Sequence, residues 1–161
     1  MREDKKILLS ILVENYAGTL SKVAGLFTRR GYNIDSLNVA ETQDPKLSRI
    51  TVAVTGDSYV IEQITKQLYK LINVIKITVL SDESSVVREL MMIKVNSEEK
   101  KRSEIIQIVN IFKANIIDVS HKSLIVSITG DEEKNNAFLD LMKPFSIIEM
   151  TRTGPTALER G

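Results

Sequence analysis

The sequence predicts an α+β protein made of two βαββαβ units of the ferredoxin-like type. Three observations indicate this fold class. Apolar residues alternate between the period of a strand and the period of a helix, in the same order in both halves of the 161-residue chain. Two short motifs occur once in each half. A polar cluster at residues 81–85 separates the halves.

The first half contains every element of one unit. Residues 6–13 form an almost unbroken apolar strand, and residues 18–30 follow as a helix whose buried stripe includes Val23 and Phe27. The pattern then predicts two strands, a helix and a last strand at residues 32–41, 48–55, 58–71 and 73–81.

The second half repeats this order after the polar cluster. A strand at residues 87–95 precedes a helix at 101–113, which has an apolar stripe that includes Ile105 and Phe112. Two strands, a helix and a final strand are predicted at residues 115–120, 123–129, 132–142 and 145–151.

Short motifs support the repeat. Asn33-Ile34-Asp35 is echoed by residues 115–118, and Thr55-Gly56-Asp57 is echoed by Thr129-Gly130-Asp131. We therefore expect a first domain at residues 1–81, a linker at 82–86 and a second domain at 87–161.

Composition excludes several classes of function. The chain has 22 basic and 21 acidic side chains, a balance that argues against a nucleic-acid partner. No apolar run is long enough to span a membrane, the charged residues 1–6 do not resemble a signal peptide, and cysteine is absent. We expect a cytoplasmic protein. His121 is the only histidine, so no metal site is predicted.

RNA recognition is the main alternative for this topology. RNA-binding proteins of this type present aromatic side chains on their central strands for base stacking. Residues 49–54 occupy that place here and contain no aromatic residue. The sequence therefore gives no support to RNA binding.

The first strand is apolar on both faces, which is unusual for a sheet that carries helices on one face only. Leu8 and Leu12 alternate with Leu9 and Ile11. A second copy of the domain, related by two-fold symmetry, would cover the open face. The other half of the same chain is the alternative cover.

The loop between the first strand and the first helix is the best candidate for a ligand site. Gly18 lets the backbone approach a ligand closely, and Asn15 offers a donor and an acceptor to a zwitterion such as an amino acid. The alternative is structural, because Asn15, Thr19 or Ser21 would serve equally well as a helix N-cap.

Asn33 is the second candidate, at the start of the second strand. We expect the start of this strand to lie beside the Asn15 loop, and in a dimer to reach the loop of the neighbouring chain. The alternative is a turn residue that bonds its own backbone.

Three segments closely resemble the regulatory small subunit of acetohydroxyacid synthase, and the resemblance extends over the whole chain. They are Glu14-Asn15-x-x-Gly18-x-Leu20, residues 25–34 and Asp44-Pro45-x-Leu47-Ser48-Arg49. The first half looks like an ACT domain, a ligand-binding βαββαβ module that is common in amino-acid metabolism.

The resemblance implies a regulatory chain without catalytic activity or cofactors of its own. Its partner would be a large subunit that carries thiamine diphosphate, Mg²⁺ and FAD and condenses two pyruvates to acetolactate. The small subunit would raise this activity and confer feedback inhibition by valine, leucine or isoleucine. The effector would lie between the first domains of a homodimer. One side would supply Asn15, Gly18 and the amides of Thr19 and Leu20, and the other side Asn33 and Ile34.

The second half lacks this site. Residues 96–102 take the place of the loop, without glycine and with Glu98 and Glu99 at the helix start. We expect these carboxylates to satisfy the helix N-terminus and repel an anionic ligand. A free-standing amino-acid sensor or an adaptor for another enzyme is the alternative function.

Overall fold

The computed structural model describes residues 5–161 and divides into two compact units. The first unit comprises the chain up to Val86 together with Thr156–Gly161, and the second comprises Val87–Pro155. Residues 156–161 were predicted to belong to the second domain, and this is wrong, because they group with the first unit. Residues 1–4, which begin the charged N-terminal segment, lie outside the described part of the chain.

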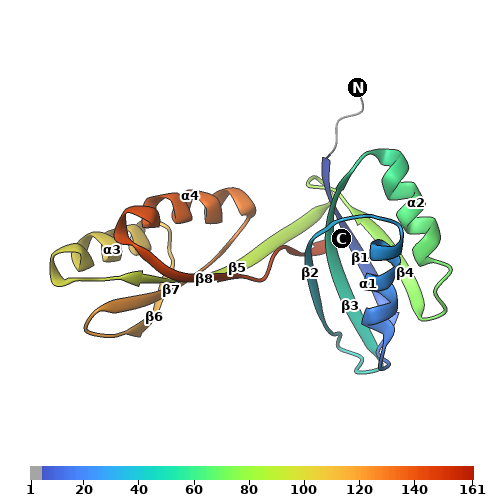
Figure 1. Ribbon diagram of the computed structural model, residues 1–161, viewed down its shortest axis with the longest axis horizontal. Helices are drawn as coiled ribbons and strands as arrows, with labels where there is room; N and C mark the ends of the chain where they lie inside the picture. Colours follow the sequence, from blue (N-terminus) through green and yellow to red (C-terminus); the bar gives the residue numbers. More distant parts are fainter. Residues whose placement is uncertain (1–4) are drawn as a thin grey trace. The chain divides into compact units, whose positions relative to one another are not determined.

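The first unit is a four-stranded antiparallel sheet with two helices on one face (Figure 1). The strand order is β2-β3-β1-β4, so β2 and β4 are its edges. The elements are β1 (Lys5–Glu14), α1 (Thr19–Arg29), β2 (Ile34–Glu41), β3 (Leu47–Gly56), α2 (Ser58–Leu68) and β4 (Val74–Leu80).

The core of the first unit lies between the sheet and the helices. Leu9, Ile11 and Val13 of β1 face the helices, as their alternation along the strand requires. Phe27 of α1 and Leu68 of α2 are completely buried against them.

The second unit repeats the architecture with strand order β6-β7-β5-β8 (Figure 1). Its core includes Phe138, whose ring packs edge-on against Phe112 at a centroid distance of 5.4 Å. The elements are β5 (Ser85–Asn96), α3 (Glu99–Ile111), β6 (Asn115–Val119), β7 (Ser123–Gly130), α4 (Glu132–Met142), a 3₁₀ turn (Lys143–Phe145) and β8 (Ile147–Arg152). The predicted βαββαβ fold of each half is confirmed.

The repeated motifs have the same role in both units. Asp57 caps α2 by accepting from the amide of Val60 at 2.9 Å, and Asp131 caps α4 by accepting from the amide of Lys134 at 2.8 Å. Such caps satisfy one of the free amides in the first turn of a helix.

The motif Asn33-Ile34-Asp35 and its echo at residues 115–118 mark an irregularity that recurs in both units. The pairing of β2 with β3 shifts between Ile34 and Ser36, and that of β6 with β7 shifts between Ile116 and Asp118. The echo between the two halves therefore marks equivalent bulges, with Ile34 matching Ile116.

A strand that the periodicity did not predict follows β8. This strand, β9 (Thr156–Glu159), pairs with β5 and contacts β1 and β4 of the first unit. On the helix-free face of that unit, Ser10 is only 3% exposed and Leu12 is half-buried. The terminal segment of the same chain thus covers part of the helix-free face of the sheet, as one of the two alternatives for the apolar first strand predicted. The second copy of the domain stays a prediction.

Candidate functional site

The loop after β1 places a helix N-terminus at the surface. Gly18 is the N-cap of α1, with φ of 85° and ψ of −8°, and a Cβ built on it would meet nothing within 4 Å. No side chain caps the helix. The alternative hypothesis, that the side chain of Asn15, Thr19 or Ser21 caps α1, is therefore wrong. The positive φ explains why the position suits glycine.

The first-turn amides differ in availability. Thr19 donates its amide to the carbonyl of Tyr16 at 3.2 Å, so this N–H is engaged within the loop. Lys22 donates to the carbonyl of Gly18 in the ordinary helical pattern. With no side-chain cap, the amides between them, Leu20 among them, are left to solvent or a ligand. Thr19 is also 5% exposed, and its hydroxyl is one of the buried polar atoms without a partner in the described chain.

Asn15 is fixed at the other end of the loop. Its amide nitrogen Nδ2 donates to Oε1 of Glu41 at 3.1 Å and to the carbonyl of Pro45 at 3.0 Å, and its backbone amide donates to the carbonyl of Lys46 at 2.7 Å. Both donors of the Asn15 side chain are used. The side-chain oxygen of this exposed residue remains as an acceptor.

Polar side chains from other elements surround the loop. Asn73 donates from Nδ2 to Glu14 at 3.0 Å and accepts from Nζ of Lys22 at 3.4 Å. Glu41 is held by Asn15. These residues were not predicted from the sequence, because only the register of β1 and β2 with β3 identifies the strand ends that meet here.

Asn33 lies far from Asn15 within one chain, contrary to the expectation that the two adjoin. Ile34 pairs with Val54 on β3, and Val54 pairs with Ile7 at the start of β1, whereas Asn15 follows the other end of that strand. The strand rise puts about 24 Å between the two levels. Antiparallel pairing causes the separation, because the start of β2 lies beside the end of β3.

The surroundings of Asn33 are those of an exposed turn. Its Nδ2 donates to Asp35 at 3.2 Å, and the second oxygen of Asp35 accepts from the hydroxyl of Thr55 at 2.7 Å. Ile34 packs, partly buried, against the core of the first unit. Asn33 is therefore positioned by a local polar cluster on β2 and β3.

The equivalent loop of the second unit is closed by an arginine. The amide of Ser97 donates to the carbonyl of Lys122, as Asn15 does to Lys46, so Ser97 is the counterpart of Asn15. Ser97 is fully buried, and Arg102 donates to its hydroxyl at 3.0 Å and to the carbonyl of Ser120 at 2.7 Å.

The predicted carboxylate cap of that loop is not formed by Glu98, which is the N-cap residue of α3 but makes no side-chain cap hydrogen bond. The guanidinium of Arg102 ties the loop to the β6–β7 turn instead. The predicted absence of an effector site there stays a prediction, with a different physical cause.

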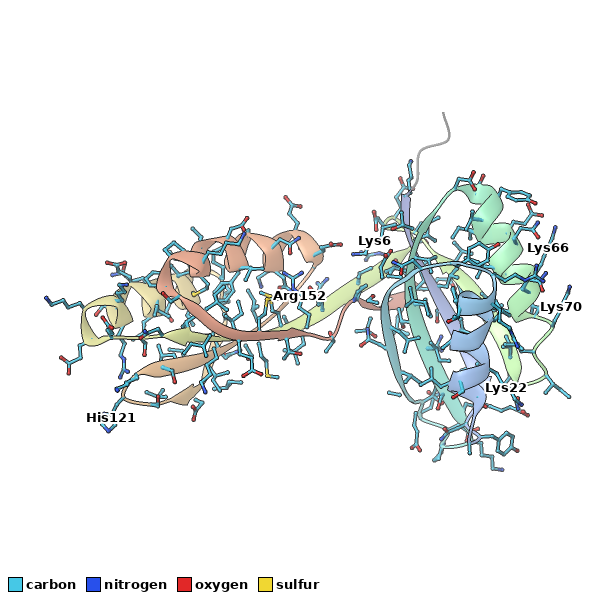
Figure 2. All side chains as sticks on the ribbon, in the orientation of Figure 1. Lys6, Lys22, Lys66, Lys70, His121 and Arg152 are labelled. Carbon is cyan, nitrogen blue, oxygen red and sulfur yellow. The ribbon has the colours of Figure 1, made fainter. Side chains whose placement is uncertain are left out.

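Other ionisable groups lie apart from the loop. His121 stands in the turn between β6 and β7 (Figure 2), and no cluster of metal-ligating side chains occurs among residues 5–161. Lys66 contacts Glu62 at 2.5 Å on α2, and its hydrogen bond and charge lower the pKa of the Glu62 carboxyl. Within the same residues, no helix is long and apolar enough to cross a membrane.

Both units match known protein families. Residues 88–161 match the family described as the small subunit of acetolactate synthase, and residues 9–76 match the AHAS small subunit-like ACT domain. The relatives include a "Probable acetolactate synthase small subunit" of Methanothermobacter thermautotrophicus, 53% identical over 96% of this chain and 92% of that protein. The acetolactate synthase small subunit of Mycobacterium bovis is 50% identical over 95% and 91%.

A solved structure agrees with these matches. The crystal structure of the acetolactate synthase small subunit from Thermotoga maritima aligns with a TM-score of 0.91 and 45% identity, over 98% of both chains. Together with the loop geometry and the two βαββαβ units, these similarities show that the chain belongs to the acetolactate synthase small-subunit family and begins with an ACT domain.

Proposed function

We propose that the chain is the non-catalytic regulatory subunit of an acetohydroxyacid synthase and confers feedback inhibition by valine or another branched-chain amino acid. It binds and activates a large subunit that carries thiamine diphosphate, Mg²⁺ and FAD. Family membership supports the partnership, because a small subunit of this synthase implies a large one. Family membership also favours this function over that of a free-standing amino-acid sensor.

The observation that carries the effector site is the uncapped N-terminus of α1. Gly18 approaches the surface in a conformation that leaves open space where a Cβ would stand, and first-turn amides after Thr19 lack a side-chain cap. A helix N-terminus of this kind attracts a carboxylate. The exposed oxygen of Asn15 accepts a hydrogen bond from the ammonium group of the same amino acid.

A homodimer would complete this site. β2 is an edge strand, so it offers its outer side to a second β2. Antiparallel pairing about a two-fold axis sets the start of one strand beside the end of the other. Glu41, at the end of β2, contacts Asn15. The dimer thus brings Asn33 and Ile34 of one protomer to the loop with Asn15, Gly18, Thr19 and Leu20 of its partner.

Regulation follows from a site that two protomers share. The effector binds fully only when both sides are correctly placed, so it favours one arrangement of the dimer. Its influence on the enzyme is limited by the difference in affinity between arrangements. A micromolar to millimolar effector has roughly 4–8 kcal/mol of binding free energy, which is sufficient for such a shift.

The test is a reconstitution with the large subunit, measured as acetolactate formation against valine concentration. Asn33→Ala should weaken valine inhibition about tenfold or more and leave activation of the large subunit intact, since it removes one side of the shared site. Asn115→Ala is the matched control, because Asn115 holds the equivalent place before the bulge of β6. It should leave both properties unchanged.

Two results would contradict the proposal. Equal loss of activation and inhibition in Asn33→Ala would show that Asn33 serves assembly rather than the effector. A chain that binds valine but fails to activate any large subunit would be a sensor for another enzyme.

A further inference from the structure

A cavity of about 220 Å³ lies on the helix-free face of the first unit. It belongs to that unit alone, because the terminal residues that line it group with β1, β3 and β4. Its size suits a ligand smaller than a drug-like molecule. The lining residues are Ser10, Leu12, Arg49, Lys76, Thr78, Leu80, Leu158 and Glu159.

Two cations lie in one row across this face. Leu12 pairs with Arg49 on β3 and with Lys76 on β4, and directly opposite residues of antiparallel strands project to the same side. Adjacent strands are about 4.8 Å apart, so the two cationic residues start about 10 Å apart with Leu12 between them. Ser10 and Thr78 form the next row and contribute hydroxyl groups.

The terminal strand adds a carboxylate from above. Leu158 and Glu159 of β9 both line the cavity, and both residues are partly open to solvent. The cavity is therefore bordered by positive charge on the sheet and negative charge on β9.

These opposite charges do not neutralise one another. Arg49 donates from Nη1 to the hydroxyl of Ser10 at 2.7 Å, which fixes the guanidinium and leaves its other N–H groups available. Lys76 and Glu159 form neither an ion pair nor a side-chain hydrogen bond with any described residue. A cation and an anion that line one cavity without contact match the two ends of a zwitterion.

We propose that this cavity binds a small aliphatic amino acid. The α-carboxylate interacts with Arg49 and Lys76, and the α-ammonium group interacts with Glu159. The side chain packs against Leu12 and Leu80, which both line the cavity. Charge-assisted hydrogen bonds of this kind are the strongest that such a site offers.

This site is distinct from the effector site proposed above. It lies on the opposite face of the sheet from α1 and is complete within one chain, whereas the loop site requires two protomers. It goes beyond the proposed function, since it adds an independent ligand. A ligand there would hold β9 against the sheet, and β9 follows the end of the second unit directly in the sequence.

Calorimetric titration of the full chain with L-valine and L-leucine tests the proposal. Asn33→Ala serves as the background, because it weakens the shared loop site and leaves the cavity intact. In this background we expect about one amino-acid site per chain. Adding Glu159→Gln or Lys76→Gln should lower the affinity of this site about tenfold or more. Glu104→Gln, on exposed α3, is the matched carboxylate control and should change nothing.

A ligand analogue tests the ammonium contact separately. 3-Methyl-2-oxobutanoate is valine with a keto group in place of the amine, so it should bind the cavity at least tenfold more weakly than valine. Equal binding of valine and the keto acid would overturn the assignment. So would unchanged affinity in both charge variants, or no saturable binding in the Asn33→Ala background. Thermal melts exclude unfolding of the variants as the cause.

The two proposals fail separately. If valine inhibition of the reconstituted enzyme is insensitive to Asn33→Ala, the shared-site assignment is wrong and the cavity assignment is unaffected. If Glu159→Gln and Lys76→Gln both leave binding unchanged, the cavity assignment is wrong and the shared-site assignment is unaffected.

Discussion

Asn15 and Glu41 are hydrogen-bonded, Nδ2 to Oε1 at 3.1 Å, although 26 positions separate them in the sequence. The bond joins the loop before α1 to the last residue of the edge strand β2. The proposed effector loop and the proposed dimer edge are thereby one structural feature, so a substitution that breaks this hydrogen bond should affect both.

Asn15→Asp should lower valine sensitivity about tenfold or more. The substitution removes both Nδ2 donors, which hold the loop to Glu41 and Pro45, and places a second carboxylate beside Glu41, so it disrupts the loop that presents the effector site. Glu41→Gln is the matched control, because glutamine keeps an acceptor for Asn15. Valine titration of the reconstituted enzyme measures both. Unchanged inhibition in Asn15→Asp would place the effector elsewhere.

Gly18→Ala should destabilise the first unit by about 1 kcal/mol, because its φ of 85° is strained for a residue with a Cβ. Gly25→Ala is the matched control inside α1, also with nothing within 4 Å of the new Cβ. It should stabilise by about 0.5–1 kcal/mol, since alanine favours helix. Urea unfolding measures both. Equal effects of the same sign would contradict the assigned Gly18 conformation.

Periodicity predicted the elements of both units because each buries one regular face. The first helix is predicted at residues 18–30 and found at Thr19–Arg29. β9 escaped prediction because its position depends on pairing with β5, far away in the sequence. Four residues with one buried side chain carry no period of their own.

The candidate site was predicted in part for a similar reason. The turn chemistry of Asn15 and Gly18 is local, so the sequence shows it. The place of Asn33 depends on which end of β3 lies beside the start of β2, and only the register determines this. The Arg102 contacts with Ser97 and Ser120 join segments that no local pattern connects.

Asp57→Ala and Asp131→Ala should each destabilise their own unit by about 1 kcal/mol, because each removes the side-chain cap of one helix. Amide hydrogen exchange separates the two units by their own strands. The Asp57 variant should raise exchange in β3 and leave β7 unchanged, and the Asp131 variant should do the opposite. Equal acceleration in both units would mean that they unfold together.

Glu89→Ala should destabilise the second unit by about 2–3 kcal/mol. Glu89 is 7% exposed, accepts from the fully buried Asn135 at 3.1 Å and lies 3.8 Å from Arg152. Its removal leaves the amide of Asn135 with only the Glu89 carbonyl as partner and takes the neighbouring charge from Arg152.

The matched control for this change is Glu149→Ala, on the exposed surface of β8. Surface substitutions of this kind change stability by about 0.5 kcal/mol or less. Hydrogen exchange of β5 and β8 amides measures the local opening free energy of both variants. A loss in Glu89→Ala no greater than that in Glu149→Ala would show that solvent replaces the buried contacts without cost, and would contradict a structural role for the cluster.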